Sequence, residues 1–233
     1  MSHNVDQILL NGEIDVQGRL VDASNATLFI SITYENDSLQ AIYKPISGER
    51  PLWDFESGNL ASRERAAYLI SELGQFHLVP LTIVREGPFG LGAVQRWIDV
   101  DEAIDLAEYF RTDAAELRST ALFDAVINNT DRKIGHLLPD LNGKLYICDH
   151  GVTFHHEDKL RTVLWQWAGK PLTPEEITQL TNLRAGILEN EEIAVLINNE
   201  EMAALLQRID RLISQGSFPL PSQEWPAVPW PPF

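Results

Sequence analysis

Strand-forming and helix-forming segments are separated along this chain, and their order limits the fold more than any other feature. Segments rich in β-branched and aromatic residues, with polar turns between them, predict strands within residues 13–46. One helix is predicted over 60–74, and two more strands over 78–87 and 90–100. Helical patterns prevail from Asp101 onward. A block of strands followed by a block of helices predicts an α+β fold with two lobes.

Turn and capping residues mark the ends of several predicted elements. Helices tend to begin at Ser, Thr, Asp or Asn with Glu three residues later, and to end at Gly. The signals are Gly74 after the first helix, capping boxes over 113–116 and 173–176, Asn142-Gly143 inside a short hairpin, Asn199 before the last helix and Gly216 after it.

Three segments follow from this order. Residues 1–98 are predicted as a mostly-β N-terminal lobe with one inserted helix, and residues 99–216 as a mostly-α C-terminal lobe. Residues 217–233 form a Pro/Trp-rich tail that cannot be a long helix, and its sequence fits either an extended strap or a free end. A cleft between two lobes is the default ligand site.

The net charge of −16 limits the partners of the protein. It argues against nucleic acid and against loose docking on an anionic membrane, and leaves other peripheral membrane contact open. A single cysteine, Cys148, excludes a disulfide framework and a cysteine-based zinc site. The N-terminus shows no secretion signal, and no apolar stretch reaches the roughly 20 residues that cross a bilayer. We therefore expect a cytoplasmic protein without integral membrane association.

Four ionisable residues stand at positions from which they could meet in the cleft. Lys44 ends a predicted strand, Glu64 lies in the next helix, Asp131 follows a helix, and Asp149 ends the hairpin. A strand lysine paired with a helix glutamate can hold a cation against phosphates, a loop acid can orient an attacking hydroxyl, and a second acid can bind Mg²⁺. Taken singly, such residues are more often solvated charges, caps or turn residues. Their joint order favours a phosphotransfer site.

The segments that contain these residues resemble the protein-kinase-like superfold. The similarity covers about residues 14–170. It is greatest to the phosphatidylinositol 3-/4-kinase group, in particular to small actinobacterial members and to type II phosphatidylinositol 4-kinases. The segments that carry it are “AIYKP”, “SRERAAYLISELGQFHLVPLT”, “NNTDRKIGHLL”, “YICDHGVTF” and “DKLRTVLWQWAGKPL”. The resemblance implies a bilobal kinase fold and an ATP-dependent kinase that phosphorylates a hydroxyl of a small polyol or inositol-like molecule, a lipid headgroup or a protein.

For the nucleotide, the resemblance implies that Lys44 contacts the α- and β-phosphates of ATP and that Glu64 holds Lys44. Ser24 and Asn25 would lie in the turn over the phosphates, which lacks the glycine-rich pattern of protein kinases. The interlobe hinge that receives adenine would consist of Gln95, Arg96, Trp97 and Ile98.

For the transfer step, the resemblance implies that Asp131 orients or deprotonates the acceptor hydroxyl, while Lys133 could neutralise the transferring phosphoryl group. Asp149 would bind the metal, followed by His150-Gly151 where the superfold usually has Phe-Gly. Five positions after Asp131 the family usually has asparagine, and this chain has His136. Imidazole suits Mn²⁺ better than Mg²⁺. Either His136 is a second metal ligand, or Asp149 and phosphates hold one ion alone, or the protein is a nucleotide-binding pseudokinase or a partner-binding module.

Basic and aromatic residues after Asp149 suggest substrate contacts. Lys159, Arg161 and Lys170 could meet an anionic substrate or belong to a solvated loop. Trp165 and Trp167 could line a pocket or pack in the core. Because the chain lacks the cysteine-rich insert of type II lipid kinases, a soluble acceptor is as well supported as a lipid.

Four histidines, His136, His150, His155 and His156, are predicted near the same centre. They could form a transition-metal site or be polar loop residues. The adjacent His155 and His156 would point to opposite faces if they lay on a strand, which favours the second interpretation.

Overall fold

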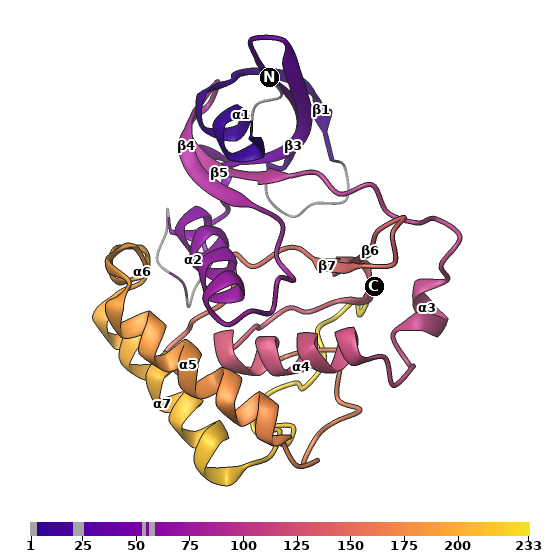
Figure 1. The fold of residues 1–233 in the computed structure, drawn as a ribbon, viewed down its shortest axis with the longest axis vertical. Helices are drawn as coiled ribbons and strands as arrows, with labels where there is room; N and C mark the ends of the chain where they lie inside the picture. The colour runs from indigo at the N-terminus through magenta and orange to yellow at the C-terminus, as the bar shows by residue number, and fades with distance from the viewer. Residues whose placement is uncertain (1–3, 21–25, 53–54, 56–58) are drawn as a thin grey trace.

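A five-stranded antiparallel sheet forms the N-terminal lobe (Figure 1). The computed structural model describes residues 4–20, 26–52, 55 and 59–233. The strand order is β1-β2-β3-β5-β4. The strands are β1 Glu13–Arg19, β2 Leu28–Tyr34, β3 Asp37–Pro45, β4 Thr82–Gly87 and β5 Gly90–Arg96. Their apolar residues alternate toward one face, so the sheet has a core side and an outer side.

A short helix, α1 (Val5–Asn11), lies within the curl of this sheet (Figure 1). The sequence patterns did not predict it. Ile8 and Leu9 are buried against apolar side chains of the sheet, among them Ile30 and Ile32. This small apolar cluster is separate from the larger core of the C-terminal lobe.

Helix α2 (Leu60–Leu73) lies between the sheet and the helices of the C-terminal lobe (Figure 1). It touches β4 and β5 on one side and α5 and α6 on the other. Ala66, Ala67 and Ile70 are fully buried, and they belong to the core of the helical lobe rather than to that of the sheet. The helix that carries Glu64 is therefore fixed by the C-terminal lobe.

The C-terminal lobe is mainly helical and contains one short hairpin (Figure 1). Its main helices are α4, α5 and α7, and the hairpin consists of β6 and β7. The 3-10 turn η1 precedes α2 in the N-terminal lobe. The bounds are η1 Ile46–Gly48, α3 Leu106–Tyr109, α4 Ala115–Ile127, η2 Ile134–His136, β6 Leu137–Pro139, β7 Leu145–Ile147, α5 Pro174–Glu189, α6 Glu191–Leu196 and α7 Asn199–Gln215.

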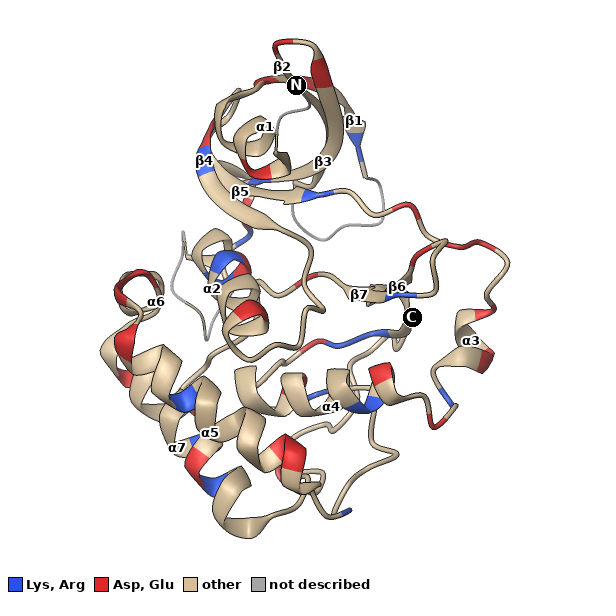
Figure 2. Ribbon diagram, viewed as in Figure 1, with Lys and Arg blue, Asp and Glu red and all other residues tan. Residues whose placement is uncertain are grey.

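The expected α+β fold with a β-rich N-terminal lobe and a helical C-terminal lobe is confirmed. The exact division at residue 98 stays a prediction, as does the bound of the tail at residue 217. No helix in the described part of the chain combines the length and apolarity needed to cross a membrane. Acidic residues occur on both lobes, so the negative charge is not confined to one of them (Figure 2).

Two of the predicted helix ends are confirmed. At the start of α5 the capping box between Thr173 and Glu176 is present in both directions. At the end of α7 Gly216 adopts a left-handed conformation with φ of +62°, which glycine tolerates without steric cost.

Two predicted helix starts are wrong in detail, whereas Gly74 directly follows the first helix as predicted. Helix α4 begins after Ala114 without a side-chain cap, so Asp113 lies one residue too early to cap it. Helix α7 is capped by Asn198, which forms a capping box with Glu201, so Asn199 is already helical. Gly74 has an ordinary φ of −82°. It is required because a Cβ atom there would lie 2.6 Å from the ring of Phe76.

The C-terminal tail is a strap and not a free end. The carbonyl of Ala227 accepts hydrogen bonds from the Thr162 amide (3.1 Å) and from Nε1 of Trp165 (2.9 Å). Further along, the carbonyl of Pro232 accepts from the amide of Ile134 at 2.9 Å. The strap therefore runs back along the helical lobe toward the hairpin, where the C-terminus lies (Figure 1).

Candidate functional site

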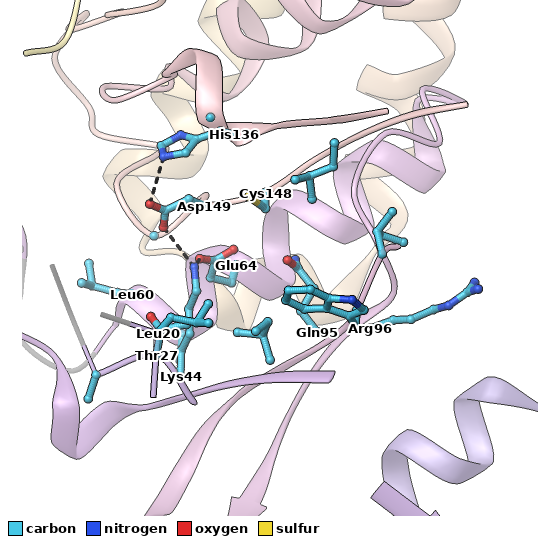
Figure 3. A pocket seen from close by; sticks show the side chains of 18 of the residues that line it. Leu20, Thr27, Lys44, Leu60, Glu64, Gln95, Arg96, His136, Cys148 and Asp149 are labelled. Carbon is cyan, nitrogen blue, oxygen red and sulfur yellow. Dashed lines mark hydrogen bonds and ion pairs between the residues drawn. The ribbon is translucent and has the colours of Figure 1, made fainter. Parts of the chain in front are cut away.

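A cavity of about 520 Å³ lies between the sheet and the helical lobe. Its size is within the range of small-molecule sites. Ionisable side chains line one end of the cavity, and the other end is mainly apolar (Figure 3). Its lining includes Ile42, Lys44, Glu64, Ile98, His136 and Asp149.

Lys44 lies between two carboxylates at the polar end of this cavity (Figure 3). Its Nζ atom is 2.5 Å from Oε1 of Glu64 and 3.0 Å from Oδ1 of Asp149. Strand β3 presents Lys44 from the sheet, α2 presents Glu64, and the loop after β7 presents Asp149. Three of the predicted site residues, far apart in sequence, are thus brought together.

These contacts determine the charges of the three groups. The positive charge of Lys44 holds the pKa of the Asp149 carboxyl well below its usual range. Burial would raise the pKa of Glu64, but the charge of Lys44, with a smaller effect of the nearby His150, outweighs it and lowers the pKa to about 2. Burial would likewise lower the pKa of Lys44, and the two carboxylates raise it instead. All three groups are charged near neutral pH.

His136 faces the other carboxylate oxygen of Asp149. Its Nε2 atom is 3.5 Å from Oδ2 of Asp149 (Figure 3). Burial lowers the pKa of His136 to about 4, against the opposing effect of Asp149. The imidazole is therefore neutral near pH 7 and has a lone pair to offer.

Asp149 adopts a left-handed backbone conformation with φ of +63°. This conformation is uncommon for residues other than glycine and concentrates at functional sites. Its side chain is 47% exposed, so the carboxylate remains accessible from the cavity. The direction of the Asp149 carboxylate is thus associated with an unfavourable backbone conformation.

The donor set fits a divalent cation only in part. Asp149 and His136 offer one carboxylate and one neutral imidazole on the same side of the cavity. Among the described residues they do not form part of a three-ligand cluster, so further oxygen ligands have to come from a bound phosphate or water. This is compatible with a metal that binds together with a phosphate chain.

Asp131 lies close to Lys133 in the loop that follows α4. Oδ2 of Asp131 is 3.2 Å from Nζ of Lys133. Burial raises the pKa of the Asp131 carboxyl, and the charge of Lys133 opposes this. The Asn129 side chain accepts a hydrogen bond from the Asp131 amide at 2.9 Å. Asp131 and Asp149 both line a second pocket of about 420 Å³.

A buried polar network that the sequence interpretation missed fixes this loop. Asp124 and Arg132 are fully buried and paired, with Oδ1 of Asp124 3.0 Å from Nη2 of Arg132. Arg132 also donates to the carbonyl of Cys148 at 2.8 Å and contacts Nε2 of His150 at 2.9 Å. The loop with Asp131 is thereby joined to the loop with Asp149. An Asp within the apolar run “LFDAVI” was the available signal.

His150 extends this network to Glu64. Burial lowers the pKa of His150, so its ring is neutral near pH 7. With Nε2 accepting from Arg132, the ring proton is on Nδ1, which lies 3.7 Å from Oε2 of Glu64. The bonded chain Asp124–Arg132–His150 therefore starts in α4 and ends 3.7 Å from Glu64 of α2.

The four predicted hinge residues line the apolar end of the large cavity. Gln95 is buried and donates through Nε2 to Oγ1 of Thr82 at 2.8 Å. Arg96 is exposed and its side chain extends away from the cavity (Figure 3). The Trp97 amide donates to the Gln40 carbonyl. Within the described part of the chain, the Ile98 amide has no hydrogen-bond partner.

The remaining predicted residues divide into three groups. Ser24 and Asn25 lie outside the described residues. Arg161 and Lys159 line the second pocket, whereas Lys170 is exposed and lines neither of the two cavities.

The two tryptophans have structural positions. Trp167 is buried in the core of the helical lobe, and Trp165 is hydrogen-bonded to the strap. Neither lines either of the two cavities.

The adjacent histidines lie in a loop, and the expectation that they point to opposite faces is wrong because the segment is not a strand. The rings of His155 and His156 are stacked, with centroids 4.4 Å apart. With Glu157 they form a group whose ligand atoms lie within 4.8 Å of one another. However, Nδ1 of His155 accepts from the Glu157 amide, and the Lys159 ammonium lies 3.4 Å from Nε2. The geometry therefore favours polar loop residues over a metal site.

Comparison with known proteins shows the family of the chain but not its activity. No protein-family model matches the chain. The crystal structure of a Helicobacter pylori proinflammatory kinase, CtkA, is similar over 89% of this chain and 94% of its own length, with 12% identity and a TM-score of 0.49. Protein Rv2133c of Mycobacterium tuberculosis is 39% identical over 264 aligned positions, which cover 97% of this chain and 94% of that protein. The chain therefore belongs to the same family as Protein Rv2133c.

Proposed function

We propose that this protein is an ATP-dependent phosphotransferase, a kinase of the phosphatidylinositol 3-/4-kinase-like type. The observation that carries the proposal is the position of Lys44 between Glu64 and Asp149 at one end of the interlobe cavity. A lysine held by a helix glutamate beside a metal-binding aspartate is the arrangement with which protein kinases bind ATP for phosphoryl transfer. Structural ion pairs also occur in proteins, but here the pair lines a cavity of ligand size.

The two ends of the cavity suit the two ends of ATP. The apolar end includes the Ile98 amide, which has no partner among the described residues and offers a hydrogen-bond donor to the adenine ring. The polar end offers the Lys44 ammonium to the phosphates. A divalent cation, Mg²⁺ or Mn²⁺, bound by Asp149 and His136 together with phosphate oxygens, would neutralise the charge of the phosphate chain.

The residues on the acceptor side have separate roles in the proposed step. The acceptor hydroxyl oxygen forms a bond to the γ-phosphorus, and the bond from that phosphorus to the β–γ bridging oxygen breaks, which releases ADP. The hydroxyl proton passes to a carboxylate oxygen of Asp131. Lys133, 3.2 Å from Asp131, stabilises the charge on the transferring group. The raised pKa of Asp131 improves it as a proton acceptor.

Nucleotide binding and turnover test this proposal separately. We expect Lys44→Ala and Asp149→Ala to weaken ATP binding in the presence of Mg²⁺ or Mn²⁺ by about tenfold or more. We expect Asp131→Asn to abolish turnover, including slow ATP hydrolysis, with ATP affinity nearly unchanged. Lys144→Ala, an exposed lysine in the hairpin turn, is the matched control. Equal ATP affinity in wild type, Lys44→Ala and Asp149→Ala would refute the site.

A pseudokinase is the second candidate, and His136 is the observation that favours it. His136 stands where the family has asparagine, and its Nε2 atom faces Asp149. If the imidazole is a metal ligand in an active kinase, His136→Asn should shift the preferred ion from Mn²⁺ toward Mg²⁺. The pseudokinase would be favoured if wild type binds ATP but does not hydrolyse it with either metal. The Asp131→Asn protein should then behave like wild type in both assays.

The acceptor and the product are part of the proposal. A hydroxyl on a polyol or inositol-like molecule, a lipid headgroup or a protein fits the chemistry of Asp131. Mass analysis of products made from labelled ATP distinguishes transfer of phosphate from transfer of AMP. We infer a cytoplasmic site of action from the sequence alone.

A further inference from the structure

The second pocket meets the large cavity at Asp149. Both cavities are lined by Leu60, Asp149 and Gly151, and the second pocket has Asp131 on its other side. Its volume is about 420 Å³, within the range of small-ligand sites. A molecule in this pocket would lie beside Asp131 and across Asp149 from the phosphates of a nucleotide.

Three cationic side chains line this pocket beside the carboxylates of Asp131 and Asp149. It is lined by Arg50, Lys159 and Arg161, three of the 18 Lys and Arg residues in a chain of net charge −16. In Figure 2 acidic residues are seen on both lobes. A guanidinium or ammonium group in the wall of a pocket can form charge-assisted hydrogen bonds with an anionic ligand.

Arg161 is the cation best suited to bind such a ligand. Its Nε atom is buried and has no hydrogen-bond partner, and within the described residues no ion pair to its guanidinium occurs. Its backbone is fixed beside Asp131, since its amide donates to Asn129 at 2.9 Å and its carbonyl accepts from Arg132 at 3.1 Å. A buried donor without a partner is costly unless a ligand supplies the acceptor. Phosphate and carboxylate oxygens match a guanidinium best.

The ammonium group of Lys159 already has partners within the protein. Its Nζ atom is 2.8 Å from Oε2 of Glu157 and 4.8 Å from the ring centre of Trp225. Lys159 therefore fixes the position of Trp225 by a cation–π contact. Its role in the pocket is structural.

The C-terminal strap forms one wall of the pocket. Trp225 and Pro226 line it, and the next residue, Ala227, is hydrogen-bonded to Thr162 and Trp165. A fixed indole ring offers a flat apolar surface with a polar edge. Such a surface suits the carbon face of a sugar or polyol ring, which presents C–H groups on one side and hydroxyls at its rim.

We propose that this pocket is the acceptor site, where Arg161 binds an oxyanion of a soluble polyhydroxy compound whose ring lies against Trp225. A lipid headgroup is disfavoured because the net charge of −16 opposes docking on an anionic bilayer. That a hydroxyl of this compound is phosphorylated rests on the proposed function. Binding of the oxyanion does not rest on it and is measured without ATP.

The test titrates the full-length protein with inorganic phosphate and with glucose 6-phosphate by calorimetry. The background is Lys44→Ala, which removes phosphate binding in the nucleotide cavity. We expect Arg161→Ala to weaken both ligands about 10- to 100-fold and Arg161→Lys to restore part of the affinity. Trp225→Ala should weaken glucose 6-phosphate about 2- to 10-fold and leave phosphate unchanged. Trp225→Phe should retain affinity, and Lys144→Ala is the folded control.

Each result decides the inference separately from the proposed function. Equal affinity of the Arg161→Ala protein and its background for both ligands would overturn it. Binding only to vesicles of phosphatidylinositol in phosphatidylcholine, with no soluble ligand bound, would also overturn it. Loss of phosphate binding in Arg161→Ala supports it even if no phosphotransfer is detected. Turnover whose acceptor KM is the same in Arg161→Ala as in wild type would support the kinase and overturn this acceptor site.

Discussion

At the scale of single residues, Lys44 determines the charge state of the site. It contacts Glu64 at 2.5 Å and Asp149 at 3.0 Å, so one cation serves two carboxylates. A phosphate that approaches Lys44 has to compete with Asp149, whose side chain is 47% exposed, and much less with Glu64, which is 3% exposed. Glu64 is therefore the permanent partner of Lys44, and Asp149 is the one that can turn to a metal.

Glu64 should make the stability of the protein depend on pH. Its pKa is about 2 in the folded protein and roughly 4.5 when unfolded. The stabilisation is therefore fully present above about pH 4.5 and is lost as the pH falls toward 2. We expect the free energy of unfolding of wild type to fall more steeply between pH 5 and pH 3 than that of Glu64→Gln. Urea unfolding at pH 7, 5 and 3 measures this.

The control for the pH series is Glu189→Gln, which changes an exposed acid on α5. Its curve should run parallel to that of wild type. Parallel curves for Glu64→Gln as well would show that Lys44 does not depress the pKa of Glu64.

At the scale of elements, α2 belongs to the helical lobe more than to the sheet. Besides its apolar face, Arg63 of α2 is 2% exposed and forms an ion pair with Glu201 of α7 and a hydrogen bond to the carbonyl of Thr153. The position of Glu64 thus depends on α7 as well as on α5 and α6. We expect little independent movement of α2.

Removing the buried pair should cost far more than removing an exposed one. Arg63→Ala leaves Glu201 buried without its partner, and we expect a loss of about 3–5 kcal/mol in the free energy of unfolding. Arg184→Ala removes an exposed pair with Asp210, which joins α5 to α7, and should cost about 1 kcal/mol or less. Chemical unfolding of both variants measures the difference. Similar losses would contradict the proposed role of Arg63.

At the scale of the whole molecule, two cavities share Asp149 and differ in their walls. The large cavity is lined by both lobes and by no residue of the tail. The second pocket has the tail residues Trp225 and Pro226 in its wall. The tail should therefore matter for the acceptor and not for the nucleotide.

Deletion of residues 223–233 tests how each of the two cavities depends on the tail. We expect ATP affinity to change by less than about threefold, because no residue of the tail lines the large cavity and the tail contacts η2 through Pro232 and Ile134, neither of which lines it. Acceptor binding should weaken by about tenfold or more, because the wall with Trp225 is lost. Calorimetry with each ligand measures both effects, and circular dichroism checks that the lobes remain folded. A large loss of ATP affinity in a folded truncation would contradict this division.

Much of the fold and the main site could be predicted from the sequence because the signals are local. Lys44, Asp131 and Asp149 stood at element ends and Glu64 within a helix, and the structure brings Lys44, Glu64 and Asp149 together. The α1 helix was missed because its seven residues carry too little periodicity. The cap of α7 was displaced by one residue because Asn198 and Asn199 are both good caps, and only the backbone selects between them.

The sequence by itself determined the strand block, the helix block and the set of ionisable residues, since side-chain period, turn residues and caps act over a few positions. Only the tertiary structure decided that Asp124 pairs with Arg132 and that Lys159, unlike Arg161, forms an ion pair with Glu157. It also decided that the tail folds back to line the second pocket. Those outcomes depend on which distant surfaces exclude water. Burial makes an unpaired charge costly and a paired one stable, and burial is a property of the packed molecule.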